Sequence, residues 1–101
     1  MPRRAIVLDP RDNVATALVE LGPGDEVELS IAPEGLVVVS IVDPIPFGHK
    51  FALADVASGE VIVKYGEIIG RSTAAIRRGA HVHVHNVASI RGSCRPPADG
   101  R

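Results

Sequence analysis

Hydrophobic and polar residues alternate most regularly in the second quarter of the chain. Between residues 25 and 31, every second side chain from Val27 to Ile31 is apolar and those between are polar. This is the two-residue period of a strand with one buried face. Residues 36–42 follow a turn that contains proline and glycine, and they are apolar on both faces. We therefore expect the two segments to form a hairpin, with 36–42 in a central position in its sheet.

Shorter apolar runs occur along the rest of the chain. They predict further strands at residues 5–8, 61–64 and 80–87. Apolar residues from Val14 to Leu21 instead recur every three to four positions, after two polar residues at 12–13 that can cap a helix. We therefore expect one short helix near residues 13–20 and a single helical turn at 72–76. We find no internal repeat.

The composition agrees with a fold made mostly of strands. Valine and isoleucine number 14 and 9 against 6 leucines, and β-branched side chains suit pleated sheets better than helices. The 10 glycines and 8 prolines are typical of many tight turns. A chain of 101 residues has room for one core, so we expect a single β domain over residues 1–88. The polar segment 89–101, which contains Cys94, is expected to be disordered.

Charge and composition exclude several classes of function. The formal net charge is −1 and only 3% of the residues are aromatic, so we expect no basic or base-stacking surface for nucleic acid. No wholly apolar run is longer than that of Leu36 to Val39, which is far too short for a membrane span. One cysteine allows no intrachain disulfide, and the N-terminus lacks a signal-peptide pattern. These features predict a cytoplasmic protein.

Three of the four histidines lie on one predicted strand. His81, His83 and His85 alternate with Val82 and Val84, so the three imidazoles are expected on one face and the valines in the core opposite. Adjacent histidines of this set lie roughly 6.6 Å apart at Cα, close enough for their rings to share a metal ion at about 2.0–2.1 Å. The outer two are too far apart to join the same ion on a flat strand. The alternative is a polar, solvated face that binds nothing.

A second group of candidates lies outside that strand. A loop shaped by prolines places His49 beside Lys50, which offers a base, a cation and a further metal ligand. Lys50 and Lys64 are the only lysines in the chain, and either ammonium group can meet a carboxylate as a point charge. The alternative is that these residues are simply solvated. Tyr65 is expected to be a core or rim residue.

Four segments, in this order, resemble one family of enzymes. They are DNVATAL at 12–18, GHKFALAD at 48–55, VKYGEIIG at 63–70 and HVHVHN at 81–86. The order resembles the small SAF-type domain or small subunit of the altronate and galactarate dehydratases, over about residues 5–88. The small subunit of sulfolactate sulfo-lyase is similar.

The resemblance implies a β-clip fold, in which a long hairpin is bent back on itself and carries one or two short helices. It implies a lyase that dehydrates sugar acids, or eliminates sulfite from sulfolactate, with a divalent metal such as iron or manganese bound mainly by a large partner subunit. On this basis we expect His49, His83 and His85 to be catalytic and Lys50 and Lys64 to bind substrate. His83 and His85 are the expected metal ligands.

Three functions remain open from the sequence. The expected one is the small subunit of a sugar-acid dehydratase that acts with a separate large catalytic subunit, and a sulfolactate sulfo-lyase subunit is the alternative within the same chemistry. The other two are a SAF module that binds a carbohydrate or an acid without turnover, and a purely structural docking domain. Loss of turnover with intact assembly, after replacement of His83 and His85, separates the enzyme from the docking domain.

Overall fold

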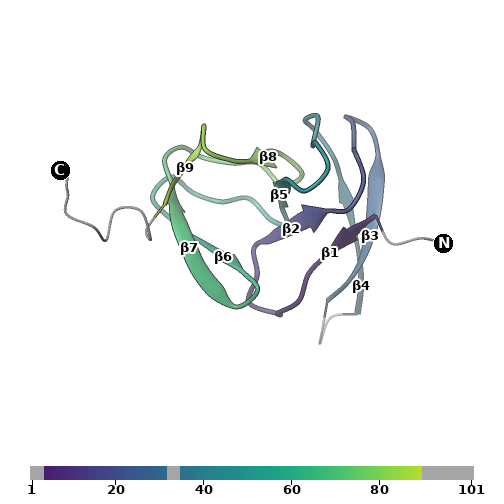
Figure 1. Ribbon diagram of the computed structural model, residues 1–101, viewed down its shortest axis with the longest axis horizontal. Coiled ribbons are helices and arrows are strands. Elements are labelled where there is room, and N and C mark those ends of the chain that lie inside the picture. Colours follow the sequence, from purple (N-terminus) through teal and green to yellow (C-terminus); the bar gives the residue numbers. More distant parts are fainter. Residues whose placement is uncertain (1–3, 32–34, 90–101) are drawn as a thin grey trace.

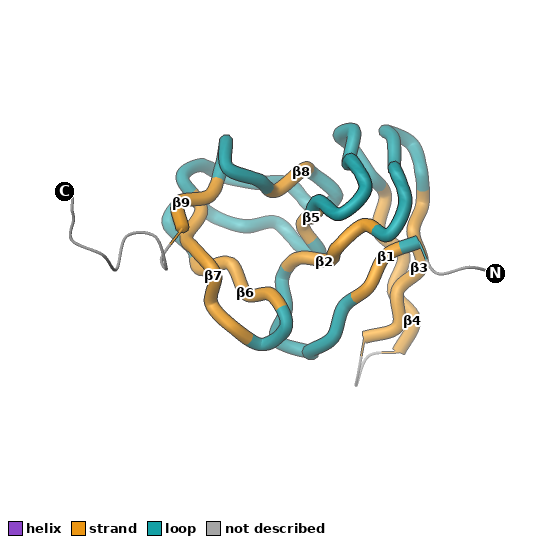
Figure 2. The backbone as a smooth tube through the Cα atoms, viewed as in Figure 1, coloured by secondary structure: helices purple, strands orange, loops and turns teal. Residues whose placement is uncertain are grey.

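The computed structural model describes residues 4–31 and 35–89. In these ranges the chain forms nine strands and no helix (Figure 1, Figure 2). The strands are β1 (Ala5–Ile6), β2 (Val14–Ala17), β3 (Glu26–Ile31), β4 (Gly35–Ser40), β5 (Lys50–Ala52), β6 (Val61–Lys64), β7 (Glu67–Ser72), β8 (His81–Val82) and β9 (Val87–Ser89). The prediction of a mostly β fold is confirmed, whereas the β-clip arrangement stays a prediction. Within the described ranges there is also no helix with the length and hydrophobicity needed to cross a bilayer.

The strands form three antiparallel sheets. A four-stranded sheet has the order β1-β2-β5-β8, a hairpin pairs β3 with β4, and a three-stranded sheet has the order β6-β7-β9. Figure 1 shows the β3–β4 hairpin at one end of the molecule and the β6-β7-β9 sheet at the other, with the four-stranded sheet between them. The division into a domain at 1–88 and a tail stays a prediction, because residues 90–101, with Cys94, lie outside the described part of the chain.

The expected helix at residues 13–20 is wrong. Residues Val14–Ala17 form β2, which pairs with β1 on one side and with β5 on the other. Pairing on both sides satisfies the main-chain donors and acceptors of this segment, and the β-branched side chains of Val14 and Thr16 suit a sheet. Tertiary pairing therefore overrides the helical spacing of the apolar residues.

The predicted hairpin is confirmed as β3 and β4. Val27 and Leu29 are buried, as the alternation predicted. The expectation that 36–42 is a central strand is wrong, because β4 pairs only with β3 among the described strands. Leu36 and Val38 of β4 are 68% and 44% exposed. Both faces of β4 are apolar, but only one of them meets the core.

The four-stranded sheet separates two hydrophobic clusters. Ala15 of β2 and Phe51 of β5 pack into the cluster on the β3–β4 side, whereas Val14 and Ala52, their neighbours in sequence, pack into the cluster that contains Ile62 of β6. This alternation follows from the two-residue period of a strand. Thr16 of β2 and Lys50 of β5 directly follow and precede Ala15 and Phe51, so their side chains project on the β6–β7 side.

One tight turn occurs four times, although the sequence showed no repeat. Its third residue is a glycine with φ between 83° and 93°, at Gly24, Gly48, Gly59 and Gly79. In all four copies the N–H of the residue after the glycine donates to the carbonyl of the residue two positions before the glycine, at 2.9–3.0 Å. A positive φ at the third position is typical of a type II turn, in which glycine is strongly favoured.

An apolar residue lies three positions before each of these glycines. The four apolar residues pair as isolated bridges, Leu21 with Ile45 and Val56 with Ile76. The helical turn expected at 72–76 is therefore wrong, since Ile76 belongs to an extended segment. The four copies share only an apolar residue and a glycine three positions later, which is too little to be recognised as a repeat. The copies at Gly48 and Gly79 lead into β5 and β8. His49 directly precedes β5, and His81 begins β8.

Candidate functional site

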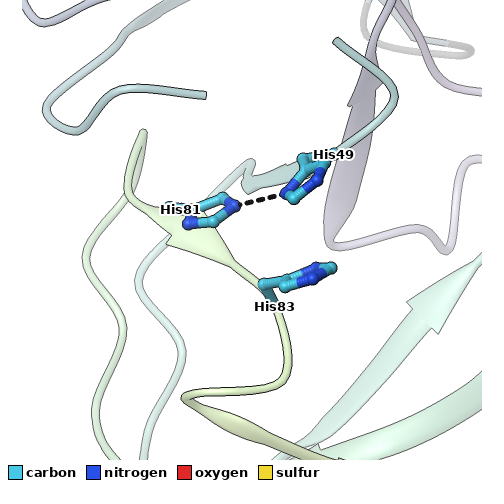
Figure 3. A group of neighbouring side chains, drawn as sticks. All are labelled: His49, His81 and His83. Atoms are coloured by element: carbon cyan, nitrogen blue, oxygen red, sulfur yellow. Dashed lines mark hydrogen bonds between the residues drawn. The ribbon is translucent and has the colours of Figure 1, made fainter. Parts of the chain in front are cut away.

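His49 and His81 face each other where β5 pairs with β8. His49 directly precedes β5, and His81 begins β8. The Nδ1 atom of His49 lies 2.9 Å from the Nε2 atom of His81, a hydrogen bond in which one of the two nitrogens carries the proton (Figure 3). The main-chain N–H of His81 donates to Oδ2 of Asp43 at 3.0 Å. Strand pairing and this carboxylate therefore fix the position of the pair.

His83 packs against the same pair from beyond the end of β8. Its ring centroid lies 4.2 Å from that of His49, with the two planes 23° apart. Its main-chain N–H donates to Oδ1 of Asn86, and Nδ2 of Asn86 donates to the carbonyl oxygen of His81, at 2.9 and 2.8 Å. Asn86 thereby closes a turn that keeps His83 next to the other two rings.

The strand predicted at 80–87 is wrong beyond Val82. The N–H of Asn86 donates to the carbonyl of His83, which closes a turn, and Val84 at the tip is 81% exposed rather than buried. Val82 is fully buried, as expected. Hydrogen bonds from an asparagine side chain to the nearby main chain favour a turn over a regular strand. The histidines after Val82 therefore do not share one strand face with His81.

The surroundings of these rings favour their uncharged form. Burial lowers the pKa of His81, and the neighbouring histidines lower it further, although Asp43 acts in the opposite direction. Burial also lowers the pKa of His83, followed by the charges of His49 and Lys50. A neutral imidazole keeps one ring nitrogen free to accept a proton or to bind a metal ion.

Three histidines have the geometry of a metal site. The ligand nitrogens of His49, His81 and His83 all lie within 4.8 Å of one another. Ligands that bind one ion at about 2.0–2.1 Å lie roughly 3 Å apart, so the first two already have that separation and His83 needs only a small adjustment. Imidazole suits iron, nickel, copper and zinc, whereas manganese prefers oxygen ligands. The residues present therefore fit a divalent ion such as iron better than manganese.

The two lysines, Lys50 and Lys64, influence each other electrostatically. Lys50 pairs with Thr16 of β2, and both lie on the β6–β7 side of the sheet. The Nζ atom of Lys64 lies 4.9 Å from the ring centroid of Tyr65, whose hydroxyl donates to Oγ1 of Thr16 at 3.4 Å. Burial lowers the pKa of Lys50, and the positive charge of Lys64 lowers it further. The positive charge of Lys50 also contributes to the lowered pKa of His83, after burial and the charge of His49.

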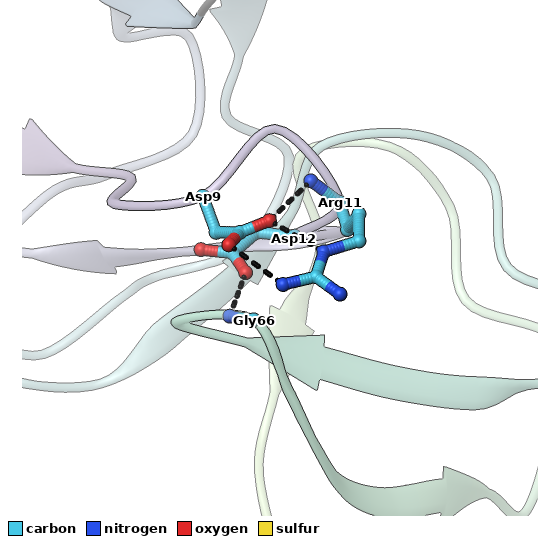
Figure 4. Close-up of polar contacts among 4 residues, drawn as sticks. All are labelled: Asp9, Arg11, Asp12 and Gly66. Carbon is cyan, nitrogen blue, oxygen red and sulfur yellow. Dashed lines mark hydrogen bonds and ion pairs between the residues drawn. The ribbon is translucent and has the colours of Figure 1, made fainter.

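The two polar residues expected to cap a helix hold the β6–β7 hairpin instead. Oδ1 of Asp12 accepts a hydrogen bond from the N–H of Gly66 at 2.8 Å (Figure 4). The side chain of Asn13 both donates to and accepts from the main chain of β6, at 2.9 and 2.8 Å. Beside them Asp9 forms an ion pair with Arg11 at 2.9 Å, which lowers the pKa of Asp9 to about 2. These contacts fix the turn that carries Tyr65 and follows Lys64.

Of the predicted site residues, the structure brings His49 and His83 together, and Lys50 and Lys64 lie close enough to influence each other electrostatically. His85 is exposed and lies at the margin, where its ring is 5.2 Å from that of His81. His81, which was not among the predicted site residues, is the third member of the converging set. The sequence also gave no role to Asp43, Thr16 or Tyr65. The one sequence signal for this arrangement was Asn86 in the HVHVHN segment, because this asparagine forms the turn after His83.

Comparison with known proteins identifies the family of this chain. Residues 3–90 match the altronate/galactarate dehydratase SAF domain. The chain belongs to this family. The SAF domain is 44% identical to altronate dehydratase of Escherichia coli (strain K12) over 75 residues, which are 74% of this chain and 14% of that protein. The family resemblance expected from the four motifs is thereby confirmed.

Two further relatives extend the comparison. The SAF domain is 51% identical over 51 residues to (2R)-sulfolactate sulfo-lyase subunit alpha of Chromohalobacter salexigens, which are 50% of this chain and 54% of that subunit. It is 36% identical over 81 residues to altronate dehydratase of Bacillus subtilis (strain 168), which are 80% of this chain and 15% of that protein. The chain therefore spans about half of the sulfo-lyase subunit and a small part of either altronate dehydratase.

Proposed function

We propose that this SAF domain forms part of the active site of a lyase that dehydrates a sugar acid of the altronate or galactarate type, together with a separate large catalytic subunit. The observation that carries the proposal is the convergence of His49, His81 and His83 beside Lys50. The relatives support it, since altronate and galactarate dehydratases match parts of this chain. A relative that is named as subunit alpha supports the need for a partner.

Dehydration of a sugar acid requires a base, an acid and positive charge. The base removes the proton from the carbon next to the carboxylate, and the electron pair forms a carbon–carbon double bond as the neighbouring hydroxyl leaves. An acid protonates that hydroxyl, so that water departs and the enol product becomes a 2-keto acid. Negative charge gathers on the carboxylate before the hydroxyl leaves, so fixed cations stabilise the transition state most at that end.

The lysines and His83 supply the groups for this step. Lys50 and Lys64 bind the substrate carboxylate, and Lys50 places it near His83. The pKa of His83 is lowered mainly by burial, so at neutral pH the ring is uncharged and can accept the proton. His49 lies against His83 at 4.2 Å between centroids and is placed to pass protons within the cluster.

A divalent metal would be held by His49, His81 and His83, and it would supply Lewis-acid polarisation of the substrate carboxylate. These three rings then serve as ligands, and His85, whose ring lies 5.2 Å from that of His81 at an angle of 30°, is the histidine that stays free to carry a proton. Iron is the metal that we propose for an all-histidine set, with further ligands from the partner. Chelator treatment of the assembled lyase separates the two arrangements, because turnover without metal requires His83 as the base.

The chain alone is expected to be inactive. The histidines and lysines of the site are only partly buried, and electrostatic catalysis is strongest where water is excluded. The large subunit is expected to cover this face. A cytoplasmic location, which the single cysteine predicts, stays a prediction.

Elimination of sulfite from sulfolactate is the second candidate. It is favoured by the identity to the sulfo-lyase subunit, which is 51% over 51 residues. The identity to altronate dehydratase is lower, 44%, but extends over 75 residues. The same proton is removed, but the carbon–sulfur bond breaks and sulfite leaves in place of water. The positive charges would then face a substrate with a carboxylate and a sulfonate.

A substrate screen on the purified complex tests the proposal. The tagged chain is used to capture its large subunit, and the complex is supplied with altronate, galactarate or sulfolactate under reducing conditions with ferrous iron. Formation of a 2-keto acid from a sugar acid supports the dehydratase, whereas sulfite release from sulfolactate supports the second candidate. A complex that converts none of the three acids contradicts both.

A further inference from the structure

Tyr65 has an unusual main-chain conformation for its residue type. With Gly66 it forms the two-residue turn between β6 and β7, and the two φ angles are 55° and 77°. Within residues 4–31 and 35–89, Tyr65 is the only residue other than glycine with a positive φ. The left-handed region is unfavourable for an ordinary L-residue, and hairpin turns of this kind favour Asn-Gly. Asparagine or glycine at this position would avoid most of that cost.

Contacts from outside the hairpin fix this turn. The N–H of Gly66 donates to Oδ1 of Asp12 at 2.8 Å. A Cβ atom on Gly66 would lie 2.7 Å from Oδ2 of Asp9 and 2.9 Å from Nη2 of Arg11 (Figure 4). The turn therefore has little freedom to shift, and the tyrosine ring has a defined direction.

The ring of Tyr65 points toward the lysine end of the site. Its hydroxyl lies 3.4 Å from Oγ1 of Thr16, the residue paired with Lys50, and Nζ of Lys64 lies 4.9 Å from its ring centroid. The side chain is 43% exposed, so it does not fill a core position. The hydroxyl group has a weak, long bond to Thr16 and retains capacity for a further hydrogen bond.

We propose that Tyr65 is a substrate-binding residue that recognises the hydroxyl groups of a polyhydroxy acid, an inference that rests on the proposed function. Lys50 and Lys64 hold the carboxylate, while the phenol hydroxyl bonds a substrate hydroxyl further along the carbon chain. The ring provides an apolar wall for the C–H groups of the same chain. The lysines therefore select an acid, and Tyr65 selects a hydroxylated one.

The test compares two dicarboxylates that differ only in hydroxyl groups, galactarate and adipate. Tyr65 is the only tyrosine and the chain has no tryptophan, so tyrosine emission of the full chain reports on this residue alone. We expect galactarate to change that emission with saturation, over the concentrations at which calorimetry detects binding. Tyr65→Phe should weaken galactarate binding by about fivefold, the effect of one hydrogen bond, and leave adipate binding unchanged. Tyr65→Asn should bind galactarate as weakly as Tyr65→Phe or more weakly. Its melting temperature should not fall, because asparagine is favoured in this turn.

Three results separate this inference from the proposed function. Equal galactarate affinity in Tyr65→Phe and in the unaltered chain would overturn the role of Tyr65. If Lys50→Met nevertheless lost galactarate binding, the proposed substrate site would still be supported. Equal loss of galactarate and adipate binding in Tyr65→Phe would also overturn it, since it would indicate a general structural effect. If the unaltered chain bound neither acid in calorimetry, both the inference and the proposed substrate site would be wrong.

Discussion

The Nδ1 atom of His49 and the Nε2 atom of His81 lie 2.9 Å apart although the two residues are 32 positions apart in the chain. The pairing of β5 with β8 brings them together, and the same type of turn precedes each strand. This separation suits a hydrogen bond between two rings, and it equally suits two ligands of one metal ion. Metal binding requires both rings to be uncharged, whereas the hydrogen bond requires only that one of them is. Acidification should therefore weaken metal binding at this site.

Metal binding should depend on His81 and not on His85. We expect the untagged chain to bind one cobalt(II) ion, a spectroscopic substitute for iron, with affinity reduced about tenfold or more in His81→Ala. His85→Ala is the matched control and should retain most of the affinity, because its ring lies outside the converging set. Calorimetry and the visible spectrum of cobalt measure both. Loss of affinity in His85→Ala but not in His81→Ala would instead favour the ligand pair expected from the sequence, His83 and His85.

Stability should fall as the pH drops below the ordinary histidine pKa. The pKa values of His81 and His83 are lowered in the folded chain, so below about pH 6.5 the unfolded chain takes up protons before the folded one does. The loss continues until the pH passes the lowered pKa values, and above pH 7 these groups contribute no slope. Melting temperatures from pH 8 to pH 5 measure the effect.

The matched variant for this pH effect is His81→Asn combined with His83→Asn. Its melting temperature should change less between pH 8 and pH 5.5 than that of the unaltered chain. Burial is the largest cause of both pKa shifts, and neighbouring charges come after it. Added salt screens only the charges, so it should reduce the difference between the two pH profiles only in part. An identical pH profile in the double variant would show that other groups cause the acid instability.

Two glycines in equivalent turns should respond differently to alanine. Gly59 and Gly79 both have positive φ, but a Cβ atom would meet nothing within 4 Å at Gly59 and would collide with the main-chain oxygen of Ser40 at Gly79. Gly59→Ala should therefore lower the free energy of unfolding by about 1–2 kcal/mol, the cost of the left-handed conformation. Gly79→Ala should lower it clearly more. Urea unfolding of both variants tests this, and equal losses would mean that the contact at Ser40 relaxes.

The contact between Asp12 and Gly66 should stabilise the β6–β7 hairpin. Asp12→Ala removes the buried acceptor of the Gly66 N–H and should reduce the free energy of unfolding by about 1–3 kcal/mol. Asp12→Asn should lose less, because it keeps an oxygen at that position and removes charge from an Oδ2 atom that is buried without a partner in the described structure. Hydrogen exchange at Gly66 provides a local readout, and unchanged protection in Asp12→Ala would contradict this role.

The sequence predicted those features that depend on local pattern. The alternation from Val27 to Ile31 identified β3, and the high content of β-branched residues indicated a sheet protein. It failed where long-range pairing decides, as at β2, where helical spacing gave way to hydrogen bonds with two neighbouring strands. Exposure of Leu36 could not be predicted either, because the pattern shows which side chains are apolar but not which face meets the core.

The candidate site was predictable in its residue types but not in its geometry. His49 and His83 were expected to meet, and their rings stack at 4.2 Å. The inclusion of His81 depends on the pairing of β5 with β8. The turn that Asn86 closes keeps His83 beside that pair, whereas a flat strand placed the three histidines differently. Tyr65 was expected only as a core or rim residue, because its positive φ, which directs the ring, is a property of the folded turn.

The most direct test of the proposed site is turnover by the assembled lyase with His83→Ala in the SAF domain. Assembly with the large subunit is verified by size-exclusion chromatography, and Val84→Ala serves as the exposed control. We predict that His83→Ala lowers kcat by about 100-fold or more, with melting temperature and assembly unchanged, whereas Val84→Ala retains full activity. Full turnover in His83→Ala, in a complex that assembles normally, would contradict the account and favour a SAF domain that only docks.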